Sequence, residues 1–252
     1  MALVVKDYQA MKKRLDSIPG DPVDAETLYL RAVYCHKKAR FERSLAYAEN
    51  LNDVYFETKY RLLVTHLELI KNEAVEEQEI VETKTFFQEQ GYRYEELEAT
   101  HIHARWLSVH RPRQAYGAYR DCIKKALNRG YPLLAARVSI DLGNDYFKGD
   151  RFHQARAWYN RALELFKEAG GENGIILAYS NLNEINKIIG QWDEIRERSL
   201  KILAYDRSQG KRLAVGFDYH NLAHFEYLMH SYESALSYCD RALEVFQELQ
   251  YL

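Results

Sequence analysis

Two histidines on one predicted helix have the spacing most typical of a metal site. His220 and His224 lie four residues apart, so an α-helix places both imidazoles on one face, as many zinc sites require. The zinc-protease pattern needs glutamate after the first histidine, and Asn221 stands there. His101 and His103 occur elsewhere, but the sequence fixes no third ligand. We therefore predict two polar surface side chains and neither a metal nor another cofactor.

Three cysteines are the next candidates for chemistry. Cys35, Cys122 and Cys239 are odd in number and far apart, which argues against a disulfide framework. Each occupies an apolar position of a helical pattern, so we expect buried core thiols. The sequence contains no glycine-rich phosphate loop and no G-x-S-x-G, HExxH or CxxC pattern. We predict that the chain is not an enzyme.

Composition limits the classes of partner. Apolar residues make up 47% and charged residues 29% of the 252 residues, as in ordinary globular proteins. The formal net charge is −2, and acidic and basic residues alternate along the chain. This gives no electrostatic basis for binding nucleic acid or an anionic membrane. No run of about 18 apolar residues and no leader peptide is visible, and we expect a cytoplasmic location.

A repeat organises the helices that carry these residues. Gly91, Gly130, Gly170 and Gly210 mark breaks between helical segments, at steps of 39, 40 and 40 residues. Glycine just past a helix enters the left-handed region without steric cost. A period of about 40 residues with two helices per unit is typical of an α-solenoid.

The repeated unit carries a recognisable pattern. Leu142-Gly143 is followed by Tyr146, and the second helix has Ala155, Tyr159 and Ala162. One or two periods away, related residues recur at Ile102, Trp106, Ala115, Tyr119, Cys122, Leu182, Trp192, Ile202, Tyr219, Leu222, Ala223, Tyr232, Ala235, Cys239 and Ala242. This pattern resembles the tetratricopeptide repeat family, in the long-unit form found in bacterial regulatory members. The resemblance implies an all-α fold, a right-handed α-solenoid of helical hairpins.

The expected organisation is one leading helix and six hairpins. Residues 1–24 are predicted to form a helix that caps the solenoid, because apolar residues recur there at helical spacing until Pro22. The hairpins are expected at about 25–55, 56–95, 96–135, 136–175, 176–215 and 216–252. The second helix of the 56–95 unit, predicted over 73–90, is degenerate because Glu79 and Glu82 stand where packing residues belong.

Packing within such hairpins assigns roles by size. Small residues are expected where helix axes approach, at Gly143, Ala155, Ala162, Ala223, Ala235 and Ala242. Large aromatic residues are expected to fill the gaps between hairpins, at Trp106, Tyr146, Tyr159, Trp192 and Tyr232. The next break is due near Gln250, and the last helix keeps the apolar pattern of an internal repeat. We therefore expect its outer face to be covered, by further sequence of a longer protein, by another copy or by a partner. We favour a fragment of a longer protein, with self-association as its consequence.

In this family the first helix of each hairpin lines a concave groove. Transferred by motif, the groove residues in this chain are Arg137, Asn144, Phe147, Lys148, Asn181, Glu184, Lys187, Phe217, His220, Asn221, His224 and Tyr227. Asparagine amides can bond both N–H and C=O of an extended backbone. Ile140 and Phe217 replace basic residues that the chaperone-tail-binding members need to clamp a terminal carboxylate. The bland alternative is that these residues merely solvate the groove.

The resemblance thus implies a protein- or peptide-binding scaffold. The alternative is a ligand- or peptide-sensing domain of a bacterial transcriptional regulator or signalling protein, which needs an output module. A catalytic solenoid would rest only on His220 and His224. The partner is expected to be a protein or extended peptide, not nucleic acid or membrane, with possible self-association through the C-terminal hairpin.

Overall fold

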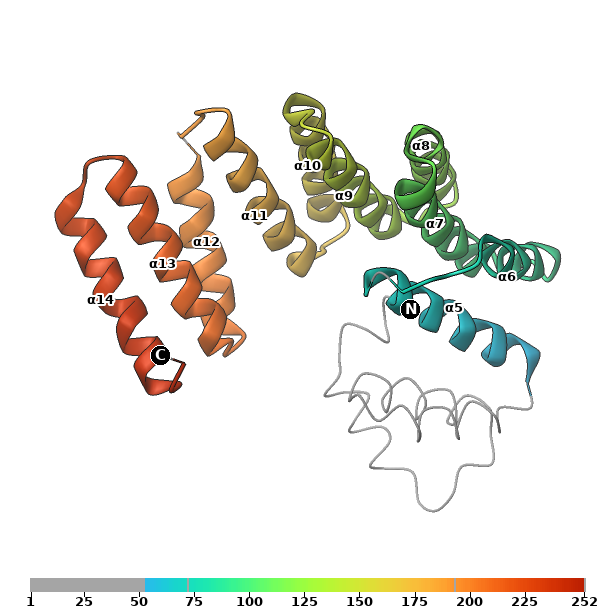
Figure 1. Cartoon of the computed structure of the whole chain (residues 1–252), viewed down its shortest axis with the longest axis horizontal. Coiled ribbons are helices and arrows are strands. Elements are labelled where there is room, and N and C mark those ends of the chain that lie inside the picture. The colour runs from blue at the N-terminus through green and yellow to red at the C-terminus, as the bar shows by residue number, and fades with distance from the viewer. Residues whose placement is uncertain (1–52, 72, 193, 252) are drawn as a thin grey trace, which may run out of the picture. The chain divides into compact units, whose positions relative to one another are not determined.

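The computed structural model describes residues 53–71, 73–192 and 194–251, and these form α-helices without any strand (Figure 1). The all-α prediction is confirmed. The helices are α5 Val54–Ile70, α6 Glu77–Glu89, α7 Arg93–His110, α8 Pro112–Asn128, α9 Pro132–Lys148, α10 Phe152–Glu168, α11 Glu172–Ile188, α12 Ile195–Ser208, α13 Arg212–Leu228 and α14 Tyr232–Glu248. In this described part, no helix has the length and hydropathy needed to cross a bilayer.

The chain divides into two compact units between Ala115 and Tyr116, within α8. The described part of the N-terminal unit contains α5, α6 and α7, which pack on one another. The C-terminal unit contains the rest of α8 and the helices α9 to α14. The predicted leading helix over 1–24, Cys35 and nearly all of the hairpin at 25–55 lie outside the described residues.

Left-handed residues end the helices where the repeat predicts. The four predicted break glycines all have positive φ, from 65° at Gly210 to 77° at Gly130. The break expected near Gln250 is also found, because α14 ends at Glu248 and Gln250 has φ 52°. Within two hairpins the same conformation is taken by Asp150 and His230, at φ 56° and 59°. These breaks set the length of each helix pair.

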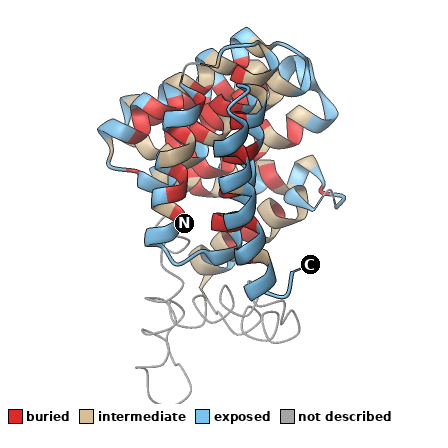
Figure 2. Cartoon of the chain, turned by 90° about the vertical axis from the view of Figure 1, so that its left-hand side faces the viewer, coloured by how far each residue is buried: buried red, intermediate tan, exposed pale blue. Residues whose placement is uncertain are grey.

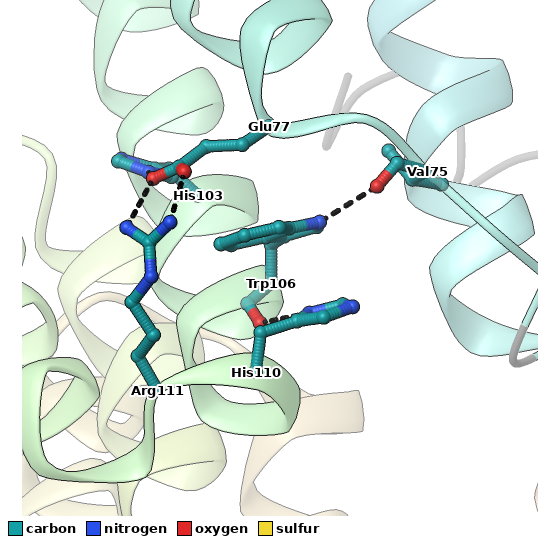
Figure 3. Close-up of polar contacts among 6 residues, drawn as sticks. All are labelled: Val75, Glu77, His103, Trp106, His110 and Arg111. Atoms are coloured by element: carbon teal, nitrogen blue, oxygen red, sulfur yellow. Dashed lines mark hydrogen bonds and ion pairs between the residues drawn. The ribbon is translucent and has the colours of Figure 1, made fainter.

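The second helix of the 56–95 region starts later than predicted. Instead of beginning at residue 73, α6 begins at Glu77. The preceding segment is held against α7, since the Trp106 indole N–H donates to the Val75 carbonyl at 2.8 Å (Figure 3). Trp106 also stacks on the His110 ring, with centroids 4.1 Å apart. The buried indole thus keeps residues 73–76 out of the helix.

A carboxylate fastens the start of α6 to α7. Glu77 accepts from Arg111 through two parallel hydrogen bonds, 2.7 and 3.1 Å long, and lies 3.0 Å from His103 Nε2 (Figure 3). The His103 contact, followed by Arg111, holds the pKa of the Glu77 carboxyl below its usual range. These contacts join the start of α6 to α7 and to Arg111, which directly follows α7.

Small residues lie at the helix contacts of the C-terminal unit, as predicted. Gly143, Ala155, Ala162, Ala223, Ala235 and Ala242 are all buried. At Gly143, an added Cβ would lie 2.5 Å from the Tyr159 ring. Trp106, Tyr146 and Tyr159 are buried as expected. This part of the repeat register is therefore confirmed.

Two packing predictions fail on the last helix. Tyr232 is 56% exposed and Cys239 is also exposed, although both occupy packing positions of the repeat. Cys122, at another packing position, is fully buried as predicted. These two side chains are exposed because no described helix packs over the outer side of α14. Figure 2 shows this side mostly exposed.

Candidate peptide-binding surface

The predicted groove residues lie on the first helices of three successive hairpins. Helices α9, α11 and α13 follow one another at intervals of 40 residues, so Arg137, Leu177 and Phe217 occupy equivalent positions. Each first helix packs on its second helix, and this packing determines which side of the first helix can meet a ligand. The predicted residues differ in how many hydrogen bonds and packing contacts they already make within the protein.

On α9 the candidates serve mostly to hold the hairpin together. The Tyr159 hydroxyl of α10 donates to Asn144 Oδ1 at 2.7 Å, and burial, with Asp141 and Asp145 nearby, raises the pKa of that phenol. Tyr159 therefore remains a donor. Phe147 packs edge-on against Phe152, with centroids 5.6 Å apart. Arg137 is half-buried and Lys148 is exposed.

On α11 an amide remains available. Asn181 is half-buried and makes no side-chain hydrogen bond to any described residue. Beside it, Leu177 is 47% exposed. Glu184 and Lys187 form an ion pair of 2.9 Å with each other on the surface. The α11 surface thus combines an uncommitted amide, an apolar side chain and a neutralised charge pair.

On α13 the candidates are the most exposed. Phe217 is 42% and Tyr227 60% exposed. His220, Asn221 and His224 are exposed and have no side-chain hydrogen bond within the described part of the chain. Asn221 is the repeat equivalent of Asn181, so two uncommitted amides occur one repeat apart.

An apolar groove lies along α13 and α14. Its volume is about 430 Å³, and its walls include His220, His224 and Tyr227 of α13 with Tyr232, Leu236 and Cys239 of α14. The three α14 residues were not among the predicted site residues. Their signal in the sequence was the apolar pattern of the last helix, which was assigned to packing. No acidic residue, lysine or arginine lines this groove.

A second hollow, of about 380 Å³, lies at the other end of the same hairpin, where the start of α13 and the end of α14 meet the turn that follows α12. Its arginines are engaged within the fold: Arg212 pairs with Glu248, and Arg207 donates to the Tyr219 hydroxyl. Arg241 stacks over the rings of Tyr219 and Tyr238. The guanidinium groups there therefore serve to join α12, α13 and α14.

The His220/His224 pair acquires no further ligand. Among residues 53–251 with their two gaps, no three His, Cys, Asp or Glu side chains converge as a metal site would require. Cys239 shares the apolar groove with the two histidines, but it does not complete such a group. The geometry offers hydrogen bonds and apolar contacts to a ligand.

Residues 219–249 match the model of a tetratricopeptide repeat. No curated protein matches the chain. Among solved structures, a Rap protein complexed with Competence and Sporulation Factor is 13% identical with a TM-score of 0.62. The match covers 95% of this chain and 80% of the Rap chain. Aspartyl phosphate phosphatase F from Bacillus subtilis is 14% identical with a TM-score of 0.63, and the match covers 97% of this chain and 74% of the phosphatase chain.

A third structure is a signal transduction ATPase with a tetratricopeptide repeat sensor, from Pyrococcus horikoshii. It is 13% identical with a TM-score of 0.74, and the match covers 94% of this chain but 37% of that one. At these identities the likeness is one of fold. The chain thus has a tetratricopeptide-like fold of helical hairpins, with a matching repeat at α13–α14.

Proposed function

We propose that this chain is a protein- or peptide-binding scaffold whose first helices α9, α11 and α13 hold an extended segment of the partner. One observation carries the proposal. Polar side chains without partners in the described fold, such as Asn181 and Asn221, lie beside exposed apolar residues on equivalent positions of successive helices.

The chemistry of these groups suits a peptide backbone. An asparagine amide both donates and accepts, so it can bond the N–H and the C=O of one extended residue. Leu177, Phe217 and Tyr227 supply apolar contacts for alternate side chains of the bound segment. Equivalent amides one repeat apart would read backbone groups without demanding a particular sequence.

We assign binding without catalysis to this surface. None of its side chains forms the nucleophile–base or paired-carboxylate arrangement that acyl transfer or hydrolysis requires. The net charge of −2 gives no electrostatic support for a nucleic-acid partner. A structural neighbour of the same fold is complexed with Competence and Sporulation Factor, which supports ligand binding by such a fold.

The second candidate is a sensing role for the same surface. It is favoured by the likeness to a tetratricopeptide repeat sensor, where the match covers 37% of a larger signalling protein. A sensor would change shape when the ligand binds. Small-angle scattering with and without the selected peptide separates the two roles, because a simple scaffold keeps its dimensions.

The binding test starts from a display library of random peptides, from which a binder is selected on the intact chain. Calorimetry then compares that peptide on the parent and on the double variant Asn181→Ala/Asn221→Ala. Each lost hydrogen bond is worth about 0.5–1.5 kcal/mol, so we expect the dissociation constant to rise by about tenfold or more.

The matched control is Asn160→Ala, which removes a half-buried amide from the second helix α10. We expect this variant to bind as the parent does. Unchanged affinity in the double variant, with a native circular dichroism spectrum, would contradict the proposed surface.

A further inference from the structure

Three arginines from three helices line the hollow of about 380 Å³ at the turn between α12 and α13. Arg207 lies in the last turn of α12, Arg212 begins α13, and Arg241 belongs to α14. The lining shares no residue with the candidate peptide-binding surface, and it includes neither Leu236 nor Leu243, the exposed leucines of α14. The chemistry of this hollow is therefore independent of both.

The positive charge in this hollow exceeds the negative charge. Glu248 pairs with Arg212, and Glu244 is the other carboxylate among the described lining residues. Glu244 is exposed and forms no ion pair within the described part of the chain. Arg207 and Arg241 likewise have no carboxylate partner there. Three arginines and two glutamates leave one positive charge uncompensated.

Both of these unpaired arginines lie against one tyrosine ring. The guanidinium carbons of Arg207 and Arg241 are 5.2 and 5.9 Å from the centre of the Tyr219 ring, and Tyr219 is buried. Arg207 donates one hydrogen bond to the Tyr219 hydroxyl, whereas Arg241 donates none to a described residue. A guanidinium group has five N–H donors. Joining the helices therefore leaves most of these donors available beside the hollow.

The position of Arg241 is neutralised in the two preceding hairpins. At intervals of 40 residues, it holds Arg161, Lys201 and Arg241. Arg161 pairs with Glu164 at 3.2 Å, and Lys201 pairs with Glu197 at 2.5 Å. Among these three described cations, Arg241 is the one without a carboxylate partner. The repeat therefore provides a neutral surface here twice and a charged surface once.

Two further differences between the repeats accompany this charge. Ser237 stands in α14 where α12 has Glu197, so the carboxylate one turn before the cation is missing. Val245 stands where α12 has Tyr205, a larger half-buried side chain whose hydroxyl donates to Asn173. The shorter side chain leaves space, and the missing carboxylate leaves charge. The result is an open hollow with guanidinium groups that the fold does not neutralise.

We propose that this hollow binds the phosphate group of a phosphate ester through Arg207 and Arg241. An esterified phosphate carries a charge of about −1.5 to −2 at neutral pH and three acceptor oxygens, and guanidinium groups bind such oxygens through paired hydrogen bonds. A carboxylate has a single charge and two oxygens, so it uses fewer of the donors. The N-terminus of α13, at Gly210 and Arg212 in the lining, adds the positive end of a helix dipole.

NMR spectra of the full chain with isotope-labelled arginine test the proposal, with inorganic phosphate as the probe. The Nε–H signals of Arg207 and Arg241, assigned from single variants, should shift and saturate as phosphate is added at constant ionic strength. We expect a dissociation constant on the order of 1 mM, because salt and water weaken contacts of exposed charges. Acetate should bind about fivefold more weakly or less, since it carries about half the charge.

Four variants separate the proposed contacts from general charge effects. Arg241→Gln should raise the dissociation constant by about fivefold or more, because it removes a charged donor. Ser237→Glu supplies the carboxylate that Lys201 has in α12, and it should weaken binding without removing a donor. Glu244→Gln should strengthen binding by about two- to fivefold, since it removes the opposing charge. Arg161→Gln is the matched control on α10, and it should leave the affinity unchanged.

A blocked tripeptide with a central phosphoserine identifies the source of the phosphate group. Tighter binding of this tripeptide than of inorganic phosphate supports a phosphorylated protein segment, and equal binding supports a small phosphate ester. The proposal is overturned if neither probe gives saturable shifts of the two arginine signals, or if acetate binds as tightly as phosphate. It is also overturned if Arg241→Gln and Ser237→Glu both keep the parent affinity with native circular dichroism.

Discussion

The hairpins α9–α10 and α13–α14 follow one sequence pattern and differ in their surroundings. Tyr159 and Cys239 occupy the same position of the repeat, yet Tyr159 is 3% exposed and Cys239 is exposed. Leu163 and Leu243 differ in the same direction. The pattern determines helices and hairpin contacts, whereas burial of the outer face depends on the next element along the stack.

The largest expected effect tests this contrast directly. Leu163→Ala should destabilise the fold by about 2–4 kcal/mol, because it leaves a cavity in a covered face. Leu243→Ala should cost less than about 1 kcal/mol, since the side chain is already 45% exposed. Urea unfolding of both variants at a concentration where the chain is monomeric measures the difference. Equal costs would refute the contrast.

The position where the two helices of a hairpin touch should also differ in stability between α9–α10 and α13–α14 when its small residue is replaced. Gly143→Ala should cost about 1–3 kcal/mol by overpacking, because the new Cβ would meet the Tyr159 ring at 2.5 Å. That ring is buried and hydrogen-bonded to Asn144, so it cannot easily move. The reverse change at the equivalent position, Ala223→Gly, should cost about 0.5–1 kcal/mol from helix propensity. Thermal unfolding compares the pair.

Asp218 of α13, which lies near Asp206 of α12, makes the stability of this end of the chain depend on pH. Burial, and then the nearby Asp206, raises the pKa of Asp218 from 3.8 to about 7. Since the folded pKa exceeds the unfolded one, the stabilising contribution is complete below pH 3.8 and is lost as pH rises through about 7. The effect should be smaller than the two above, because the group is partly solvated.

Asp218→Asn should remove this pH dependence and raise stability on the alkaline side of that window. Chemical unfolding at several pH values, with Asp240→Asn on the exposed side of α14 as the control, measures it. Identical pH profiles for parent and Asp218→Asn would exclude Asp218 as the responsible group.

The smallest expected effect concerns the turns inside the two hairpins. Asp150 and His230 both take left-handed backbone angles that favour glycine. Asp150→Gly should stabilise by about 0.5–1 kcal/mol, because relief of a left-handed penalty of about 1–2 kcal/mol outweighs the extra backbone entropy that glycine loses on folding, about 0.5–1 kcal/mol. His230→Gly should gain less, because it removes the contact of 2.9 Å between His230 Nδ1 and the Tyr232 hydroxyl. Differential scanning calorimetry resolves the pair, and a larger gain at His230 would contradict this ranking.

Much of the fold is predictable because it depends on local signals. Break glycines, helical spacing and small residues such as Ala155 and Ala235 act within one hairpin, and all appear where expected. The late start of α6 was not predictable, since it depends on Trp106 reaching back 31 residues to Val75. Contacts of that kind leave no periodic trace in a sequence.

The candidate surface was predictable in outline only. A family pattern identifies the outward positions, but it does not show that Asn144 is bonded to Tyr159 while Asn181 has no side-chain hydrogen bond in the described fold. The exposure of Tyr232 and Cys239 was also missed. Their residue types indicate packing, and only the absence of a covering helix among described residues reverses that interpretation.

Packing that is mainly between neighbouring helices has a consequence for backbone dynamics. In the C-terminal unit α10 is held by α9 and α11, whereas α14 is held mainly by α13. Stability in such a stack is a sum of nearest-neighbour terms, so amide hydrogens of α14 exchange through local opening well before those of α10. The exchange rates of the α14 amides therefore report whether another molecule is bound to the uncovered side of this helix, because such binding would slow the local opening.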